Sequence, residues 1–379
     1  MNVKVSDIIT ICKGKKPKTI SKEPQEGYMP YVDIKAFEQK IVDNYTNGEK
    51  CLPCKDGDLL LVCDGSRSGL IGRAIKGYVG STLARIDLDD RIIPDYIFYF
   101  IQGKYTQLNT SMKGTGTPHV NQELLKSFEL YVPTKQDQHR IVTRIEELFS
   151  ELDSGVETLK KTQAQLAVYR QAVLKEAFSN IVKTDIIRNL STLVTSGSRG
   201  WAKYYSDAGA IFVRIGNLTR TGIEINFDDI QYVSLPEKAE GVRSRLKPND
   251  ILVSITADLG SIGLAPVDID EAYINQHIAL VRFKNPNQGK FMAYYLRSDY
   301  GQKELLKNKR GAGKLGLGLD DIRDSKVPVV TDDEADKIVA EIESRLSVCD
   351  SIEKTIETAL QEAEALRQSI LKQAFEGGL

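Results

Sequence analysis

The sequence lacks the features on which several large classes of protein depend. None of its apolar runs approaches the ~20 residues that a membrane helix needs, and its N-terminus does not have the pattern of a secretory signal. We therefore expect a soluble, cytoplasmic protein with no membrane partner. Its five cysteines are scattered along the chain, which argues against a disulfide framework. With 379 residues, 41% of them hydrophobic, the chain should form two or more domains with real cores.

Residues and motifs typical of catalysis are also scarce. The chain has three histidines, no evident Ser/His/Asp arrangement and no Walker A sequence. The stretch "GAGKLG" (311–316) has dinucleotide-motif spacing, but it follows a Lys/Arg run where a strand is needed. "NPNQ" (285–288) lacks the aromatic residue that would stack a flipped base, and Cys51 and Cys54 lack the close second pair that structural zinc requires. We predict a non-catalytic chain that holds no cofactor and no metal.

The net charge of −1 hides an uneven distribution of charge along the chain. Residues 1–135 carry +3 and residues 181–330 carry +4, whereas residues 136–180 carry −1 and residues 331–379 carry −7. Two long segments are thus mildly basic, and the two shorter segments between and after them are acidic. This pattern permits a polyanionic partner on the basic segments without proving one.

The two acidic segments are copies of each other. Residues 141–178 align without a gap with residues 338–375, and 14 of the 38 pairs are identical. Apolar residues recur every three or four positions in both copies, which predicts long helices that pair as a coiled coil. Before each copy, Thr134 or Thr331 stands three residues ahead of an acid, the spacing of a helix-capping box.

The repetition continues upstream with a drifting offset. "GDLLLV" (57–62) matches "NDILVS" (249–254) as a strand, and the aromatic segments 94–108 and 289–308 match as helices. The sequence therefore predicts an α/β chain with two similar domains and two long helices that pack on each other, in an internal repeat. We place the first domain at 1–135, the first helix at 136–180, the second domain at 181–330 and the second helix at 331–379.

This layout, together with three motifs, resembles the specificity (S) subunit of type I restriction-modification systems. "VPTKQDQHRIVTRIEELF" (132–149) is similar to the family's lead into its first helix, and "YRQAVLKEAF" (169–178) and "LRQSILKQAF" (366–375) are similar to its helix ends. "TSGSRGWAKYYSDAGAIFVRIGNL" (195–218) resembles the opening of one class of the family's target recognition domains. The second lead-in, "VPVVTDDEADK", departs from the family pattern because it has no glutamine.

The resemblance implies a function for the whole chain. In that family each recognition domain reads one half of a bipartite site in double-stranded DNA. The resemblance implies that the two similar α/β domains are joined by two long antiparallel coiled-coil helices in a pseudo-twofold internal repeat. It also implies that the helices dock two modification (methyltransferase) subunits and, through the complex, restriction/translocase subunits. S-adenosylmethionine, ATP and Mg²⁺ would then belong to those partner subunits. Two other readings stay open at this point: the sequence reader of a methyltransferase-only or related type II complex, and a coiled-coil scaffold that does not bind DNA.

Candidate DNA-binding residues lie on loops rich in glycine, serine and basic side chains. Lysine and arginine bind phosphates, and arginine, serine and threonine also read base edges. For Trp201, core packing and stacking beside DNA are both open interpretations. The candidates in the first domain are Lys13, Lys15, Lys16, Lys18, Arg67, Lys113, Thr115, Thr117 and His119. Those in the second are Arg199, Trp201, Lys203, Tyr204, Thr256, Lys309, Arg310 and Lys314.

Candidate partner-docking residues follow from the family-like motifs alone. They occupy the lead into the first helix and the ends of both helices. The residues are Gln136, Asp137, Gln138, Arg170, Phe178, Arg367 and Phe375.

Overall fold

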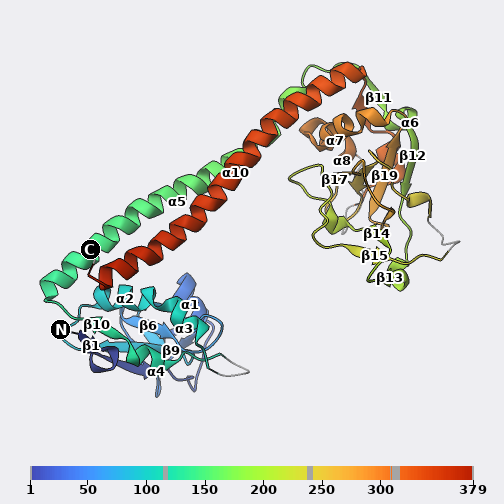
Figure 1. The fold of residues 1–379 in the computed structure, drawn as a ribbon. Coiled ribbons are helices and arrows are strands. Elements are labelled where there is room, and N and C mark those ends of the chain that lie inside the picture. Colours follow the sequence, from blue (N-terminus) through green and yellow to red (C-terminus); the bar gives the residue numbers. More distant parts are fainter. Residues whose placement is uncertain (1, 114–117, 237–241, 308, 310–315, 378–379) are drawn as a thin grey trace. The chain divides into compact units, whose positions relative to one another are not determined.

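The chain divides into two compact units, each of which contains parts of both long helices. The computed structural model describes residues 2–113, 118–236, 242–307, 309 and 316–377. One unit comprises Met1–Leu159 and Glu357–Leu379, and the other comprises Lys160–Ile356. Within the described residues, no helix is both long and apolar enough to cross a membrane. Figure 1 labels the elements of both units.

The two predicted long helices are present and equal in length. Helix α5 spans Lys135–Phe178 and helix α10 spans Asp332–Phe375, 44 residues each. In the first unit the early part of α5 packs against the end of α10, and in the second unit the end of α5 packs near the start of α10. The helices therefore run antiparallel in each unit, as the family resemblance implied, and they pair through the apolar residues that the period predicts.

Both helices begin with the predicted threonine cap, but the two acids act differently. Each threonine hydroxyl oxygen accepts the N–H of the residue three positions on, at 3.2 Å for Thr134 and 3.3 Å for Thr331. The longer Glu334 side chain accepts the Thr331 N–H at 2.9 Å, which completes a capping box. Asp137, one carbon shorter, accepts the hydroxyl of Thr134 at 2.8 Å instead.

The first unit is built on two four-stranded sheets. Its helices pack beside the sheets (Figure 1), and a short antiparallel pair joins the N-terminus to the strand before α5. The sheets have the strand orders β2-β9-β6-β7 and β4-β3-β8-β5. The elements are β1 (Asn2–Lys4), β2 (Ile9–Lys13), β3 (Met29–Val32), α1 (Ile34–Gln39), β4 (Tyr45–Thr46), β5 (Pro53–Cys54), β6 (Leu59–Val62), β7 (Ile71–Arg73), β8 (Gly77–Val79), β9 (Leu83–Leu88), α2 (Pro94–Gly103), α3 (Tyr105–Thr110), α4 (Gln122–Ser127) and β10 (Glu129–Tyr131).

The second unit repeats this plan. Its two four-stranded sheets have the orders β12-β19-β16-β17 and β13-β15-β14-β18, and β11 pairs with β20 as β1 pairs with β10. In both units the second sheet contains one parallel pair, β3 with β8 or β14 with β18. The elements are β11 (Thr184–Ile186), α6 (Ile187–Leu190), β12 (Ser191–Ser196), β13 (Tyr205–Ser206), β14 (Ala210–Val213), β15 (Gln231–Val233), β16 (Ile251–Ser254), β17 (Ile262–Leu264), β18 (Ala272–Ile274), β19 (Ile278–Phe283), α7 (Gly289–Arg297), α8 (Asp299–Leu306), α9 (Leu319–Arg323) and β20 (Lys326–Pro328).

The continuous apolar run of β6 is explained by burial on both of its faces. All four of its residues are buried, and successive side chains of a strand point to opposite faces. Leu59 and Leu61 belong to the core beneath α2, whereas Leu60 and Val62 belong to the core beneath the second sheet. In the second unit β16 divides its residues between two cores in the same way.

The predicted aromatic helices are present, but each is broken in two. A single helix was expected over 289–308, whereas α7 ends at Arg297 and α8 begins at Asp299. Buried Ser298 has extended backbone angles and accepts the Gly301 N–H at 3.3 Å, which caps α8. In the first unit the expected helix over 94–108 is likewise divided into α2 and α3 at Lys104.

Candidate nucleic-acid interface

Three loops of the first unit meet at the Asp64 carboxylate. Lys13 ends β2, and its Nζ lies 3.0 Å from Asp64 Oδ2. His119 Nδ1 lies 2.7 Å from Asp64 Oδ1, and the backbones of these two residues form an antiparallel bridge. Lys113 pairs with the His119 backbone in turn. Lys13, Asp64, Lys113 and His119, which come from three separate predicted stretches, are thus brought together although they lie far apart in the sequence.

The neighbours of Asp64 stabilise the ionised state of its carboxylate. Its side chain is 15% exposed, and burial alone would raise its pKa. Hydrogen bonds from His119 and Lys13 outweigh that effect and lower the pKa below its ordinary value. Asp64 therefore stays ionised near neutral pH and fixes the relative positions of the three loops.

The candidate cations of the first unit divide into paired and unpaired groups. Lys18 forms an ion pair with the exposed Glu49 at 2.6 Å, and Lys113 forms one with the exposed Glu123 at 2.5 Å. Arg67 pairs with Glu38 at 2.5 Å. Lys15 and Lys16 are exposed, and neither has an ion-pair partner among the residues that the structure describes. These two lysines are the ammonium groups most available to a phosphate.

The corresponding cluster of the second unit is built around a turn that the sequence analysis did not single out. Asn275, Gln276 and His277 follow β18, and the Asn275 side chain accepts the His277 N–H at 3.0 Å. Thr256 Oγ1 lies 2.8 Å from His277 Nδ1, and the backbone of Thr256 bridges to Gly316. The polar run "NQH" directly after the buried strand "AYI" was the available signal.

A glycine in each unit lets the first loop pass close to the second sheet. A Cβ on Gly14 would lie 2.2 Å from the Gly80 carbonyl oxygen, and one on Gly197 would lie 1.9 Å from the Ile274 carbonyl oxygen. Such distances exclude any side chain at these positions. Lys16 and Arg199 each follow the glycine by two residues, so the two cations occupy equivalent places in the two units.

The candidate residues around Arg199 have different surroundings. Arg199 is exposed, and its guanidinium has no hydrogen-bond or ion-pair partner within the described part of the chain. Lys203 is exposed, with its Nζ 4.8 Å from the centre of the half-buried Tyr204 ring. Trp201 is only 4% exposed and stacks on Phe212, with ring centroids 5.5 Å apart. Of the two interpretations of Trp201, the structure shows core packing, so its place among the DNA-contacting candidates is corrected.

One of the remaining DNA-binding candidates is described by the structure. Lys309 is exposed. Thr115, Thr117, Arg310 and Lys314 lie outside the described residues.

Three of the predicted docking residues pack within their own unit, and two of them are buried there. Gln138 is fully buried: its amide oxygen accepts the Ile93 N–H at 2.9 Å, and its amide nitrogen donates to the carbonyls of Arg91 and Pro133. Phe178 is 4% exposed in the core of the second unit. Phe375 is half-buried, with its ring centre 5.1 Å from that of Tyr96. All three side chains support the fold. Burial corrects the docking roles of Gln138 and Phe178, whereas the docking role of Phe375 stays a prediction.

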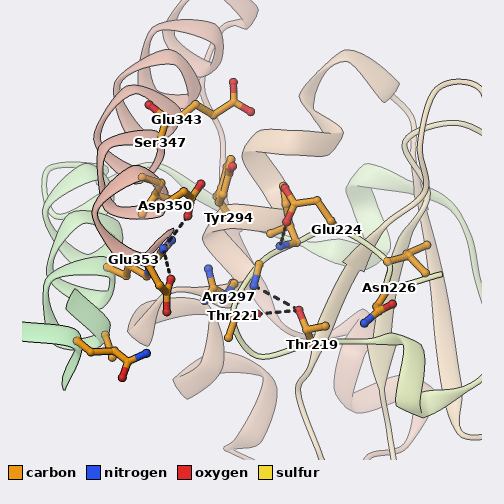
Figure 2. Close-up of a pocket in the computed structure, with 17 residues that line it drawn as sticks. Thr219, Thr221, Glu224, Asn226, Tyr294, Arg297, Glu343, Ser347, Asp350 and Glu353 are labelled. Atoms are coloured by element: carbon orange, nitrogen blue, oxygen red, sulfur yellow. Dashed lines mark hydrogen bonds and ion pairs between the residues drawn. The ribbon is translucent and has the colours of Figure 1, made fainter. Parts of the chain in front are cut away.

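The other predicted docking residues are more accessible. Gln136 is exposed and Asp137 is half-buried at the start of α5. Arg170 lies 2.6 Å from Asp350 and 2.8 Å from Glu353, and Arg367 pairs with Asp153. Arg170 is equivalent to Arg367, and Asp350 to Asp153, at the helix offset of 197. The ion pair between Arg170 and Asp350 in the second unit (Figure 2) is therefore repeated in the first unit by the equivalent residues Arg367 and Asp153, with the roles of the two helices exchanged.

No metal site is assembled by the residues that the structure describes, because none of their His, Cys, Asp and Glu side chains gather in groups of three or more suited to an ion. Burial raises the pKa of both Cys54 and Cys63 to about 11. Without a metal ion, these thiols therefore stay protonated near neutral pH.

Comparisons with known proteins agree on one family. Its model, described as the type I restriction modification DNA specificity domain, matches residues 1–165 and 206–362. The MjaVIII type I specificity subunit of Methanocaldococcus jannaschii is 27% identical over 398 residues, which cover 97% of this chain and 89% of the relative. The EcoBI specificity subunit of Escherichia coli is 23% identical over 353 residues, which cover 85% of this chain and 73% of the relative.

Two solved structures share the fold. One, from work on complex assembly and conformational transition of the type I R-M system, aligns with a TM-score of 0.76 at 18% identity, over 100% of this chain and 98% of that chain. The HsdS subunit from Thermoanaerobacter tengcongensis aligns with a TM-score of 0.56 at 19% identity, over 100% and 97%.

Proposed function

Because this chain belongs to the family of type I restriction modification DNA specificity domains and is a specificity subunit that recognises a DNA target, we propose that each of its two units reads one half of a bipartite duplex site. The observation that carries this proposal is the repeated loop cluster. In each unit the loops after equivalent strands converge, and each cluster presents an exposed cation two residues beyond a glycine that admits no side chain.

The two clusters differ in the groups that they offer to DNA. The first is rich in lysines, which act as point charges toward phosphates. Its exposed ion pairs are weak and can exchange their carboxylate partner for a phosphate. The second presents Arg199, whose planar guanidinium can bind guanine O6 and N7 together, beside the polar turn 275–277. We therefore assign the first cluster mainly to backbone positioning and the second to base contacts as well.

The same proposal extends to the partners of the chain. The two long helices would dock two modification subunits, and restriction/translocase subunits would join through the assembled complex. S-adenosylmethionine, ATP and Mg²⁺ would bind in those subunits, so this chain would contribute recognition and no catalytic step. A role on DNA would place the chain in the cytoplasm. Support comes from the reciprocal repeat of the helices and from the description of the structural neighbour, which concerns assembly of a type I R-M complex.

A competition titration tests the DNA-reading role. The target is first identified by mapping methylated sites in cells that express the chain with its modification subunit. The purified complex is then titrated with a duplex of that target and with a scrambled duplex of equal length at fixed salt. We expect the target duplex to bind about a thousandfold more tightly than the scrambled duplex, or more tightly still. Equal affinity for the two duplexes would contradict the proposal.

A further inference from the structure

The turn 275–277 of the second unit holds a glutamine whose side-chain amide is fixed by a histidine. Gln276 and His277 are both half-buried, and Gln276 Nε2 lies 3.0 Å from His277 Nε2. An amide nitrogen donates hydrogen bonds and does not accept them, so the histidine nitrogen is the acceptor. This hydrogen bond sets which way round the Gln276 carboxamide faces.

The other contacts of His277 hold its ring in the same state. In an imidazole whose Nε2 accepts, the one ring proton lies on Nδ1. His277 Nδ1 lies 2.8 Å from Thr256 Oγ1 and donates to it. The backbone of His277 is fixed as well, because its N–H donates to Asn275 Oδ1 at 3.0 Å and its carbonyl accepts the Ile255 N–H at 2.9 Å. The acceptor that orients Gln276 is therefore itself held from several sides.

The groups that Gln276 keeps free match one base. Its Oε1 and its second amide N–H have no hydrogen-bond partner among the residues that the structure describes. One acceptor and one donor on a planar amide can accept from N6 of adenine and donate to N7 in the major groove. Guanine presents two acceptors at the corresponding positions, so it cannot satisfy the amide oxygen.

The turn lies beside the loop that carries the exposed cation of the second unit. Ser198 and Asn275 form a parallel backbone bridge, and the exposed Arg199 directly follows Ser198. Thr256, which accepts from His277, lies in the loop between β16 and β17. Gln276 is thus part of the same loop cluster as Arg199.

The equivalent turn of the first unit cannot read a base in this way. Strands β8 and β18 end at equivalent residues, because Val79 and Ile274 close the parallel pair of the second sheet in each unit. The carbonyl of Thr82 accepts the Cys63 N–H at 2.8 Å, as the carbonyl of His277 accepts the Ile255 N–H. The matching residues of the first unit are therefore Gly80-Ser81-Thr82, which offer neither a carboxamide nor an imidazole.

We propose that Gln276 reads an adenine in the half-site of the second unit, and that His277 is the positioning residue that fixes the Gln276 amide for this base. This inference rests on the proposed reading of DNA by the two units. A carboxamide that turns over presents two patterns of donors and acceptors, and the bond to His277 selects the pattern that adenine matches before DNA binds. The base pair differs from the one assigned to Arg199, because a guanidinium has donors only and suits guanine.

A competition titration of the purified complex tests the role of Gln276. The competitors are duplexes in which each specified base pair of the target is replaced in turn. Gln276→Ala should reduce the preference for one A·T pair about tenfold or more, in the same half-site as the pair that Arg199→Ala relaxes. Preferences in the other half-site should stay as in the wild type, which shows that the variant is folded. The matched control is Asn189→Ala, which removes an exposed carboxamide of the same unit that donates to Asp185 and should change no preference.

The role of His277 is tested by a variant that keeps one of its two side-chain bonds. His277→Asn retains an N–H donor near Thr256 and lacks the acceptor for Gln276. It should reduce the preference at the same A·T pair by about threefold, the cost of ordering one side chain at an interface. Combined with Gln276→Ala it should cause no further loss, because a positioning residue acts only through the residue that it positions.

The outcomes separate this inference from the proposed function. If the wild type prefers its target and Gln276→Ala relaxes no base pair, or relaxes one that lacks adenine, the assignment of Gln276 is wrong. If His277→Asn relaxes a different base pair, or adds to the loss caused by Gln276→Ala, His277 is not its positioning residue. If the wild type binds target and scrambled duplexes equally, the proposed reading of DNA is itself wrong and the inference is lost with it.

Discussion

The two units share a backbone topology and differ in some of the polar side chains that it carries. Strands β6 and β16 divide their residues between two cores in the same way, and Phe178 and Phe375 each pack against two rings of the aromatic helix in their own unit. At positions that face loops or pockets, by contrast, Asp64 corresponds to Thr256 and Gln102 to Arg297. Apolar packing constrains both copies in the same way, whereas these polar positions differ between the copies.

One backbone carbonyl accepts a hydrogen bond in both units, but the donor is a different residue in each. The Pro133 carbonyl, before α5, accepts from the Gln138 amide at 3.1 Å. Its equivalent at the offset of 197, the Val330 carbonyl, accepts from Gln288 at 3.1 Å. In the first unit the donor lies on the long helix, and in the second it precedes α7. The residue equivalent to Gln138 is the buried Ala335, so the loss of glutamine from the second lead-in is compensated within the fold.

The largest expected effect compares the two phenylalanines at the helix ends. Phe178 is 4% exposed, so Phe178→Ala should lower the free energy of unfolding of the second unit by about 3–5 kcal/mol. Phe375 is half-buried, so Phe375→Ala should cost the first unit about 1–3 kcal/mol. Hydrogen exchange followed by mass spectrometry measures each unit separately through the peptides of β16 and β6. Val182→Ala, at a residue 92% exposed, is the control, and equal losses in the two variants would contradict the comparison.

The next effect isolates the buried glutamine of the first unit. Gln138→Met leaves the Ile93 N–H without its acceptor and two carbonyls without a donor. It should therefore destabilise the first unit by about 1–3 kcal/mol. Its exposed neighbour provides the matched variant Gln136→Met, which should stay within about 0.5 kcal/mol of the wild type. Thermal unfolding of the two variants measures this difference. Identical unfolding midpoints for the two variants would show that the Gln138 hydrogen bonds contribute nothing to the stability of the first unit.

A third prediction contrasts the two equivalent loop cations. Arg199→Ala should weaken binding to the specific duplex by about 1–3 kcal/mol and relax the preference at one base pair. Lys16→Ala should weaken specific and scrambled duplexes about equally, with a slightly shallower salt dependence. Competition titrations of both variants at two salt concentrations distinguish these outcomes. If Arg199→Ala leaves the ratio of specific to scrambled affinity unchanged, Arg199 does not contact a base.

The smallest effect is a difference in acid sensitivity between the units. The pKa of Asp64 is lowered in the folded state, so its stabilisation is present above the ordinary value near 3.9 and is lost as the pH falls through the lower folded value. Thr256, its equivalent, does not titrate. Because the Lys13 partner is half-exposed, the contribution should be only about 0.2–1 kcal/mol.

Asp64→Asn supplies the measurement for this effect. Urea unfolding of the wild type and the variant at pH 7 and near pH 3 should show a difference at pH 7 that shrinks in acid. A difference of the same size at both pH values would mean that the Asp64 ion pairs do not stabilise the first unit.

The sequence predicts the repeated parts of this molecule better than its particular contacts. The long helices and the strands around 58–62 and 250–255 are visible because local apolar period and an internal repeat specify them. The break at Ser298 depends on a buried cap, and the burial of Trp201 depends on strands that follow it in the chain. The roles of Gln138 and of the turn 275–277 likewise arise from non-local hydrogen bonds. Local pattern cannot reveal such contacts, and for this reason the sequence indicates which loops carry polar and basic groups but not which partner each side chain has.

The most direct test of independent reading by the two units is to exchange one of them. Residues 181–330 are replaced by the corresponding segment of a related specificity subunit, and methylated sites are mapped in cells that express the hybrid with the modification subunit of this chain. If each unit reads its own half-site, one half of the target changes and the other half stays as in the wild type. A hybrid whose two half-sites change together would contradict the account.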